Sequence, residues 1–171
     1  ASLEALSRYP DIDSIMDAGT FHEETSVLAQ KVTYLVCSQD YARQFSNIEV
    51  SIQDENSWRQ TFDALHALNA GYIVVTLGDQ GLLYEDTQGI HHIEAFNVSA
   101  VDTTGAGDGF IGSFLNQLAY EGRTLDDMKK MTDKEWESYL IFSNRYCGES
   151  IQKKGALSSY LTRREMEMLF G

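Results

Sequence analysis

Apolar positions recur along the chain with two different periods, and together they predict a succession of helices and strands. Spacings of three and four residues indicate three helices, over residues 2–8, 23–30 and 55–68. In the third of these, Trp58, Phe62 and Leu65 share one face. Short apolar runs indicate three strands, over residues 12–16, 32–37 and 72–77. Apolar strands that alternate with helices are typical of a mostly parallel sheet covered by helices.

Beyond residue 77 the pattern predicts an antiparallel pair of strands and then helices. The strands are expected over residues 81–85 and 90–98, joined by a turn at 86–89. Helices are expected from within or just after the glycines at 105–109, over 125–151 and over 163–170. Thr162 and Glu165 have the spacing of a capping box at the start of the last helix. Because the chain has no repeat, low-complexity segment or linker, we expect one α/β domain over residues 1–171.

A glycine-rich segment carries the most informative chemistry. It consists of Asp102, Thr103, Thr104, Gly105, Ala106, Gly107 and Asp108, and it runs directly into an apolar helical pattern. Small residues let the backbone approach an anion, and the free N–H groups at a helix start favour a phosphate by about 1 kcal/mol at an exposed site. A flexible glycine cap, with Asp108 as a first-turn charge, is the alternative. The two aspartates of the segment favour a phosphoryl-transfer site.

Other nucleotide motifs do not account for this segment. The chain has no Walker-type sequence, and the G-x-G-x-x-G match at 107–112 is followed by a predicted helix where a dinucleotide site needs a strand. Residues 102–108 resemble instead the second signature of the ribokinase-like, PfkB-type sugar kinase family. The resemblance implies a three-layer α/β/α fold and an ATP-dependent phosphotransferase that acts on an alcohol group of a sugar or related small molecule. It implies Asp108 as general base, and the N–H groups of Gly105, Ala106 and Gly107 as donors to the transferring phosphoryl oxygens.

The same resemblance extends to nucleotide contacts. The strand at 72–77 and the glycines after it match the family's strand and T-L-G-x-x-G, which makes Thr76, Gly78 and Gly81 nucleotide-binding candidates. A β-hairpin turn explains these residues nearly as well. Asn144 stands where family members place an asparagine near the adenine, or it is an exposed helix residue.

Metal contacts are implied at two further places. Asp102, with the Thr104 carbonyl beside it, resembles the position that helps to form a monovalent-cation (K⁺) site in many relatives, and a turn-capping aspartate is the alternative. Where many relatives carry N-x-x-E to organise Mg²⁺, this chain has residues 38–41 with the sequence Ser-Gln-Asp-Tyr. Some ketohexokinase-like relatives also have a serine there. Ser38 therefore stays a cofactor-binding candidate, with Asp40 as a substitute carboxylate.

The composition of the chain limits the kinds of molecule that it can bind. The chain of 171 residues has a formal net charge of −13, which makes nucleic acid and anionic membranes unsuitable partners. An acidic protein that binds ATP needs Mg²⁺ and aimed backbone dipoles. Cys37 and Cys147 lack the spacing of a zinc site or disulfide framework, and the adjacent His91 and His92 read as surface residues of a strand. The absence of an apolar run long enough for a bilayer, and of a signal-peptide pattern, favours a cytoplasmic location.

The resemblance covers only part of a typical family member. It leaves unmatched the N-terminal half, which supplies the sugar-contacting residues, the first glycine signature and a small β lid. We therefore expect a fragment with an exposed sheet edge and little activity of its own, and a homodimer for the full-length protein. Two functions are compatible with the sequence: a sugar kinase, supported by Asp108, and a non-catalytic binding module, supported by the unusual segment at 38–41.

Overall fold

The computed structural model describes residues 2–120 and 131–170. The chain forms two compact units, Ala1–Glu94 and Ala95–Gly171. The first unit contains the sheet, and the described part of the second unit is built from helices and connecting segments.

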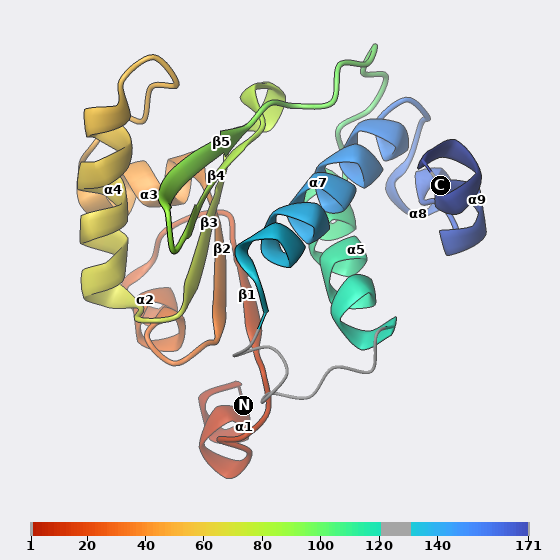
Figure 1. Ribbon diagram of the computed structural model, residues 1–171. Helices are drawn as coiled ribbons and strands as arrows, with labels where there is room; N and C mark the ends of the chain where they lie inside the picture. Colours follow the sequence, from red (N-terminus) through yellow and green to blue (C-terminus); the bar gives the residue numbers. More distant parts are fainter. Residues whose placement is uncertain (1, 121–130, 171) are drawn as a thin grey trace. The chain divides into compact units, whose positions relative to one another are not determined.

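The first unit is organised around a five-stranded sheet whose spatial order follows the chain. Its strands are β1 (Ile15–Ala18), β2 (Tyr34–Ser38), β3 (Tyr72–Thr76), β4 (Leu82–Asp86) and β5 (Gly89–Ile93). The first three are parallel, β4 is antiparallel to β3, and β5 is antiparallel to β4. Four of the five strands therefore point the same way, which confirms the prediction of a mostly parallel α/β sheet (Figure 1).

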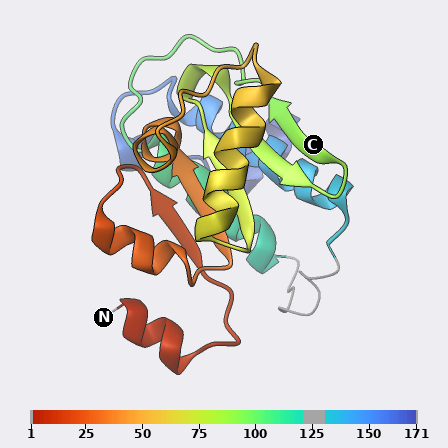
Figure 2. The ribbon, with the colours of Figure 1, turned by 90° about the vertical axis from the view of Figure 1, so that its left-hand side faces the viewer.

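Helices of the first unit cover one face of this sheet (Figures 1 and 2). They are α2 (Glu23–Ala29), α3 (Gln39–Ser46) and α4 (Glu55–Leu68), whereas α1 (Ser2–Arg8) precedes β1. Leu35 and Val75 on that face of the strands are buried in one apolar core with Leu65 of α4. Val36 and Val74, on the opposite face, are buried as well. Burial on both faces explains why the strands read as continuous apolar runs.

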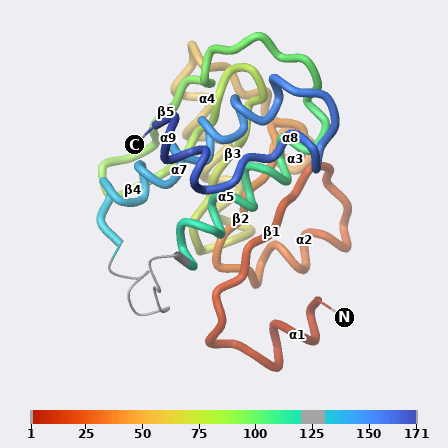
Figure 3. The backbone as a smooth tube through the Cα atoms, turned by 90° about the vertical axis from the view of Figure 1, so that its right-hand side faces the viewer, coloured from red at the N-terminus to blue at the C-terminus, as the bar shows by residue number. Residues whose placement is uncertain are grey.

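The second unit contains α5 (Ala106–Tyr120), α7 (Asp133–Ser150), α8 (Ala156–Ser159) and α9 (Arg163–Phe170), which can be followed in Figure 3. Helices α5 and α7 pack along each other. The rings of Phe114 and Trp136 meet edge to face between them, with centroids 5.5 Å apart. Such aromatic contacts supply a large share of the buried apolar area in a small unit.

The bounds of four helices agree with the sequence to within one residue. Helices α1, α4 and α9 have the predicted bounds, and α2 ends one residue early. Glu165 accepts hydrogen bonds from the Thr162 N–H and hydroxyl groups at 2.7 Å, so the predicted capping box is present. A helix was predicted from residue 125, and its first six residues, 125–130, lie outside the described ranges. Residues 131 and 132 were wrongly predicted as helical, because Thr132 and Glu135 form a second capping box that starts α7 at Asp133.

Strand ends agree less well. The strand predicted over 90–98 ends at Ile93, because Ile93 pairs with Leu82, the first residue of β4, and no residue of β4 lies beyond it. The strand predicted over 12–16 is shifted to Ile15–Ala18, where its partner β2 begins at Tyr34. Helices α3 and α8 were not predicted.

Candidate functional site

The glycine turn before α5 leaves backbone donors free. Gly105 has φ +79°, and its carbonyl accepts the Gly109 N–H at 2.8 Å, as expected of the residue that caps a helix start. The Ala106 N–H donates to the Thr103 carbonyl at 3.1 Å. In the described ranges no atom accepts a hydrogen bond from the N–H groups of Gly105, Gly107 and Asp108. These three amides are therefore available to a ligand.

Several other helices of the chain cap their first amides with a side chain. The side chains of Ser38, Asp54 and Thr132 accept backbone N–H groups at the starts of α3, α4 and α7. Gly105 has no side chain to do so. The uncapped amides of α5 carry the partial positive charge of the helix start, so the arrangement can bind an anion such as a phosphate.

Asp108 is the third residue of α5, and its side chain is exposed. An exposed carboxylate in the first turn offsets the helix dipole, as the simpler interpretation of the sequence proposed. Exposure also leaves it accessible to a ligand at the free amides, as a general base requires. The geometry is compatible with both roles.

Asp102 connects the glycine segment to the chain before α8. One of its carboxylate oxygens accepts the Thr104 N–H at 3.0 Å and the other accepts the Gly155 N–H at 2.9 Å. Hydrogen bonds from Thr104, and then from Gly155, lower the pKa of Asp102 below its ordinary value. These contacts describe a turn-capping aspartate, and the cation site with the Thr104 carbonyl stays a prediction. Within the described residues there is no cluster of three or more His, Cys, Asp and Glu side chains placed to hold a metal ion.

Two residues that the sequence did not connect with the candidate site donate hydrogen bonds to backbone carbonyls of the glycine segment. The Tyr160 hydroxyl donates to the Gly105 carbonyl at 2.8 Å, and the Cys147 thiol donates to the Ala106 carbonyl at 2.8 Å. Burial raises the pKa of Cys147 to about 12, so this side chain stays a thiol at neutral pH. Their sequence separations from the segment, 55 and 41 residues, explain why no local signal indicates either contact.

The predicted nucleotide residues of the first unit gather at the carboxyl ends of two parallel strands. Ser38 and Thr76 are partners in the register of β2 and β3. Gly78 and Gly81 have φ values of +63° and +93° in the turn that leads into β4, and the Leu77 N–H donates to the Gly81 carbonyl at 2.7 Å. Positive φ at both positions explains the choice of glycine. The carboxyl ends of parallel strands are also where ligands of α/β sheets bind.

Ser38 has a structural role in addition. Its hydroxyl donates to the Gly19 carbonyl at 2.6 Å and accepts the Tyr41 N–H at 3.0 Å, which caps α3. The Asp40 carboxylate is exposed and pairs with Arg43 at 3.0 Å. The segment at 38–41 thus starts a helix.

The remaining candidates occupy ordinary positions. Asn144 is half-buried on α7, and its contact with adenine stays a prediction. His91 bonds to Asp86 at 2.8 Å within the hairpin, and His92 bonds to the Gln80 carbonyl at 2.6 Å. His92 therefore helps to hold the glycine turn after β3.

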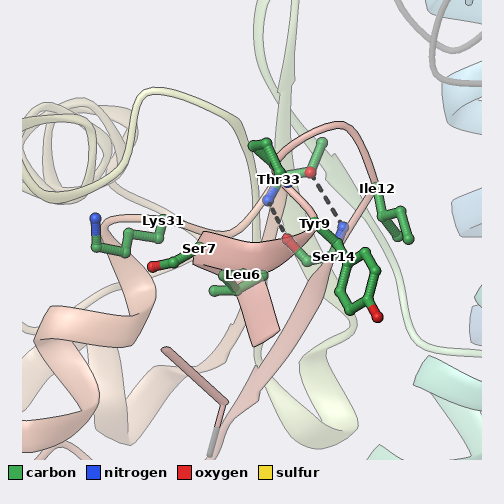
Figure 4. Close-up of a pocket in the computed structure, with 8 residues that line it drawn as sticks. Leu6, Ser7, Tyr9, Ile12, Ser14, Lys31 and Thr33 are labelled. Atoms are coloured by element: carbon green, nitrogen blue, oxygen red, sulfur yellow. Dashed lines mark hydrogen bonds between the residues drawn. The ribbon is translucent and has the colours of Figure 1, made fainter. Parts of the chain in front are cut away.

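A pocket of about 310 Å³ lies at the opposite end of the strands (Figure 4). Its lining includes Ser14 and Thr33, which precede β1 and β2 and exchange hydrogen bonds at 3.1 and 3.2 Å, together with Tyr9 and Lys31. None of the predicted site residues lines it.

The mostly parallel sheet and the glycine turn before α5 place the chain among α/β proteins that can bind an anion at a helix start. The family model for the pfkB family carbohydrate kinases matches residues 9–163, so the chain belongs to this family and the resemblance inferred from residues 102–108 is confirmed. None of the helices in the described ranges combines the length and apolar character that a bilayer crossing needs.

Two curated relatives illustrate the match. Fructokinase-1 of Zea mays is 34% identical over 122 residues, which cover 70% of this chain and 34% of that protein. The ribokinase of Staphylococcus aureus (strain COL) is 30% identical over 132 residues, which cover 77% of this chain and 39% of that protein. The chain thus spans less than half the length of these relatives.

Solved structures establish the fold. The ribokinase of Giardia lamblia superposes with a TM-score of 0.79 at 21% identity, over 98% of this chain and 53% of that one. The Arabidopsis thaliana ribokinase, solved with ribose and ATP, superposes with a TM-score of 0.71 at 20% identity, over 97% of this chain and 49% of that one. The predicted ribokinase-like α/β fold is confirmed.

Proposed function

We propose that the protein to which this chain belongs transfers the γ-phosphoryl group of ATP to an alcohol group of a sugar or related small molecule. The observation that carries the proposal is the start of α5, where the exposed carboxylate of Asp108 adjoins the unbonded N–H groups of Gly105 and Gly107. A phosphoryl-transfer site needs an accessible base and donors for an anion, and both occur here within four consecutive residues.

In this proposal Asp108 takes the proton of the sugar hydroxyl as its oxygen bonds to the γ-phosphorus, and ADP leaves with the electrons of the broken P–O bond. The N–H groups of Gly105 and Gly107 hold the phosphoryl oxygens. Ala106 is a donor to the same group only if its N–H exchanges the bond to the Thr103 carbonyl for one to the ligand. The helix start then stabilises the charge that develops in the transition state.

The other contacts with ATP and ions are proposed residue by residue. Thr76, Gly78 and Gly81 remain nucleotide candidates because they lie at the carboxyl ends of the parallel strands, and Ser38 adjoins Thr76 there. Mg²⁺ accompanies ATP with few protein ligands, since it keeps water and phosphate oxygens around it. We place the candidate K⁺ site at Asp102 and the Thr104 carbonyl because a carboxylate and a carbonyl are the oxygen donors that hard cations prefer.

Fructose and ribose are the acceptors that we would test first. Fructokinase-1 of Zea mays and the ribokinase of Staphylococcus aureus share 34% and 30% identity with this chain. The Arabidopsis thaliana ribokinase structure contains both ribose and ATP and has the same fold. A homodimer and a cytoplasmic location stay predictions of the sequence.

The proposal is tested by Asp108→Asn in the protein expressed from the full reading frame that contains this chain. Loss of a general base should reduce turnover roughly 100- to 10,000-fold, or about 3–5 kcal/mol of barrier, while ATP affinity stays within a few-fold. The control is Glu137→Gln, the same carboxylate-to-amide change at an exposed position of α7. Sugar-dependent ADP release and calorimetric ATP titration provide the two readouts.

The competing function is a binding module that kept the fold. Its support is Ser38, whose hydroxyl is committed to capping α3 where many relatives carry the metal-organising motif. If the wild-type protein binds ATP but no sugar produces ADP above background, the binding module is correct and the kinase proposal is wrong. Equal turnover in wild type and Asp108→Asn would exclude Asp108 as the base.

A further inference from the structure

Tyr160 contacts the glycine turn at the point where the free amides begin. Its hydroxyl donates to the Gly105 carbonyl at 2.8 Å. An ideal Cβ on Gly105 would lie 2.7 Å from the Tyr160 oxygen, and one on Gly109 would lie 3.3 Å from the Tyr160 ring. The phenol therefore packs against Gly105 of the turn, 55 residues away in the chain, and against Gly109 in the first turn of α5.

The bond from Tyr160 completes the hydrogen bonding of the Gly105 carbonyl. This oxygen also accepts the Gly109 N–H at 2.8 Å, so both of its lone pairs are used. Because a peptide unit is planar, holding the Gly105 carbonyl also fixes the Gly105–Ala106 peptide plane. The direction of the amides that follow depends on that plane. A side chain 55 residues along the chain thus holds the peptide that precedes the free amides of Gly107 and Asp108.

Tyr160 also lies near the proposed base. Partial burial, and next the negative charge of Asp108, raise the pKa of Tyr160 above its ordinary value. A tyrosine with its ordinary pKa of 10.0 is protonated and able to donate at neutral pH, and the raised pKa extends that state to higher pH. Its ring adjoins that of Tyr146, with centroids 6.2 Å apart, and the Tyr146 hydroxyl donates to the Leu161 carbonyl at 3.1 Å.

We propose that Tyr160 is a positioning residue for phosphoryl transfer, whose hydroxyl orients the Gly105–Ala106 peptide so that the following amides meet the transferring group. The proposal rests on the function proposed above. It predicts that removing the hydroxyl weakens interactions with the transition state more than interactions with the bound nucleotide, because the misplaced donors act on the phosphoryl group in transfer.

The test compares Tyr160→Phe with Tyr146→Phe in the protein from the full reading frame. Each variant loses one hydroxyl that donates to a backbone carbonyl, but only Tyr160 bonds to the glycine turn. Calorimetry gives the Kd for ADP with aluminium fluoride and Mg²⁺, which mimics the phosphoryl group in transfer, and the Kd for ADP alone. We expect Tyr160→Phe to weaken binding of the mimic roughly 3- to 10-fold, with ADP affinity within about twofold of wild type. We expect kcat of Tyr160→Phe to fall by the same factor as its affinity for the mimic. Tyr146→Phe should match wild type in kcat and in both Kd values.

The two proposals fail in different ways. If wild type neither turns over any sugar nor binds the mimic more tightly than ADP, the proposed function is wrong. If wild type does both and Tyr160→Phe behaves as Tyr146→Phe does, the proposed function stands and the positioning role of Tyr160 is overturned. A variant that is merely less well folded lowers the binding stoichiometry and leaves Kd unchanged, so a loss of stoichiometry alone also counts against the positioning role.

Discussion

Gly105→Ala tests how closely the turn before α5 is packed. The backbone at Gly105 has φ +79°, a conformation that costs an alanine about 1–2 kcal/mol. The added Cβ would lie 2.7 Å from the Tyr160 oxygen and 2.8 Å from the Ala156 Cβ, both shorter than real contacts. The phenol must move and lose its bond to the Gly105 carbonyl, worth about 1 kcal/mol. We therefore expect a loss of about 2–3 kcal/mol in the free energy of unfolding.

Gly112→Ala is the matched control in the same helix. Gly112 is exposed, and nothing lies within 4 Å of an added Cβ. Alanine in a helix interior is more favourable than glycine by about 0.5–1 kcal/mol, because glycine loses more backbone entropy on folding. The two glycine-to-alanine changes should therefore alter stability in opposite directions.

The assay is urea unfolding of wild type and both variants, with sugar-dependent turnover measured in parallel. The unfolding midpoint should fall for Gly105→Ala and rise for Gly112→Ala at an unchanged slope, and turnover should fall only for Gly105→Ala. A stability within about 0.5 kcal/mol of wild type for Gly105→Ala would refute the reasoning, since that is the ordinary range of an unconstrained surface change.

Two further predictions concern single polar side chains. Asn69 is 1% exposed, donates to two backbone carbonyls at 2.5 and 2.9 Å and accepts the Gly71 N–H at 2.7 Å. Asn69→Ala leaves these groups unpaired and should cost about 3 kcal/mol in urea unfolding; a loss below about 1 kcal/mol would contradict it. Asp102 has a pKa lowered by Thr104 and Gly155 from 3.8, so its stabilising contribution is present above that value and is lost as pH falls through the lower folded value. In Asp102→Asn the free energy of unfolding should therefore fall less steeply than in wild type as the pH decreases below 3.8. Equal slopes in the two proteins would show that Asp102 makes no such contribution.

Several helix starts in this protein were predictable because their signals are local. Helix α4 begins after Asp54, whose carboxylate accepts the Asn56 N–H at 3.0 Å, and α9 begins after a capping box contained in four residues. Such bonds form within one turn, whatever the rest of the fold does. Helix α3 has a comparable local signal in Ser38, whose hydroxyl accepts the Tyr41 N–H at 3.0 Å and caps the helix.

Strand ends were less predictable because a partner strand decides them. Apolar residues continue past Ile93, at Ala95, Phe96 and Val98, but β5 stops at Ile93 because β4 begins at Leu82 and pairs with it. No residue near position 93 carries that information. The β1 start is another case, since it depends on the pairing of Ile15 with Tyr34.

The candidate site likewise has features that local sequence specifies and features that depend on residues distant in the chain. That Gly105, Gly107 and Asp108 lie together at a helix start, and hence the family, follows from the sequence, because a turn and the first residues of a helix are consecutive in the chain. Which of those amides are free, and which groups hold the turn, depends on the folded chain: the Gly155 N–H bonds to Asp102 and the Tyr160 hydroxyl bonds to Gly105. These contacts join residues 53 and 55 positions apart, and packing alone brings them within hydrogen-bond distance.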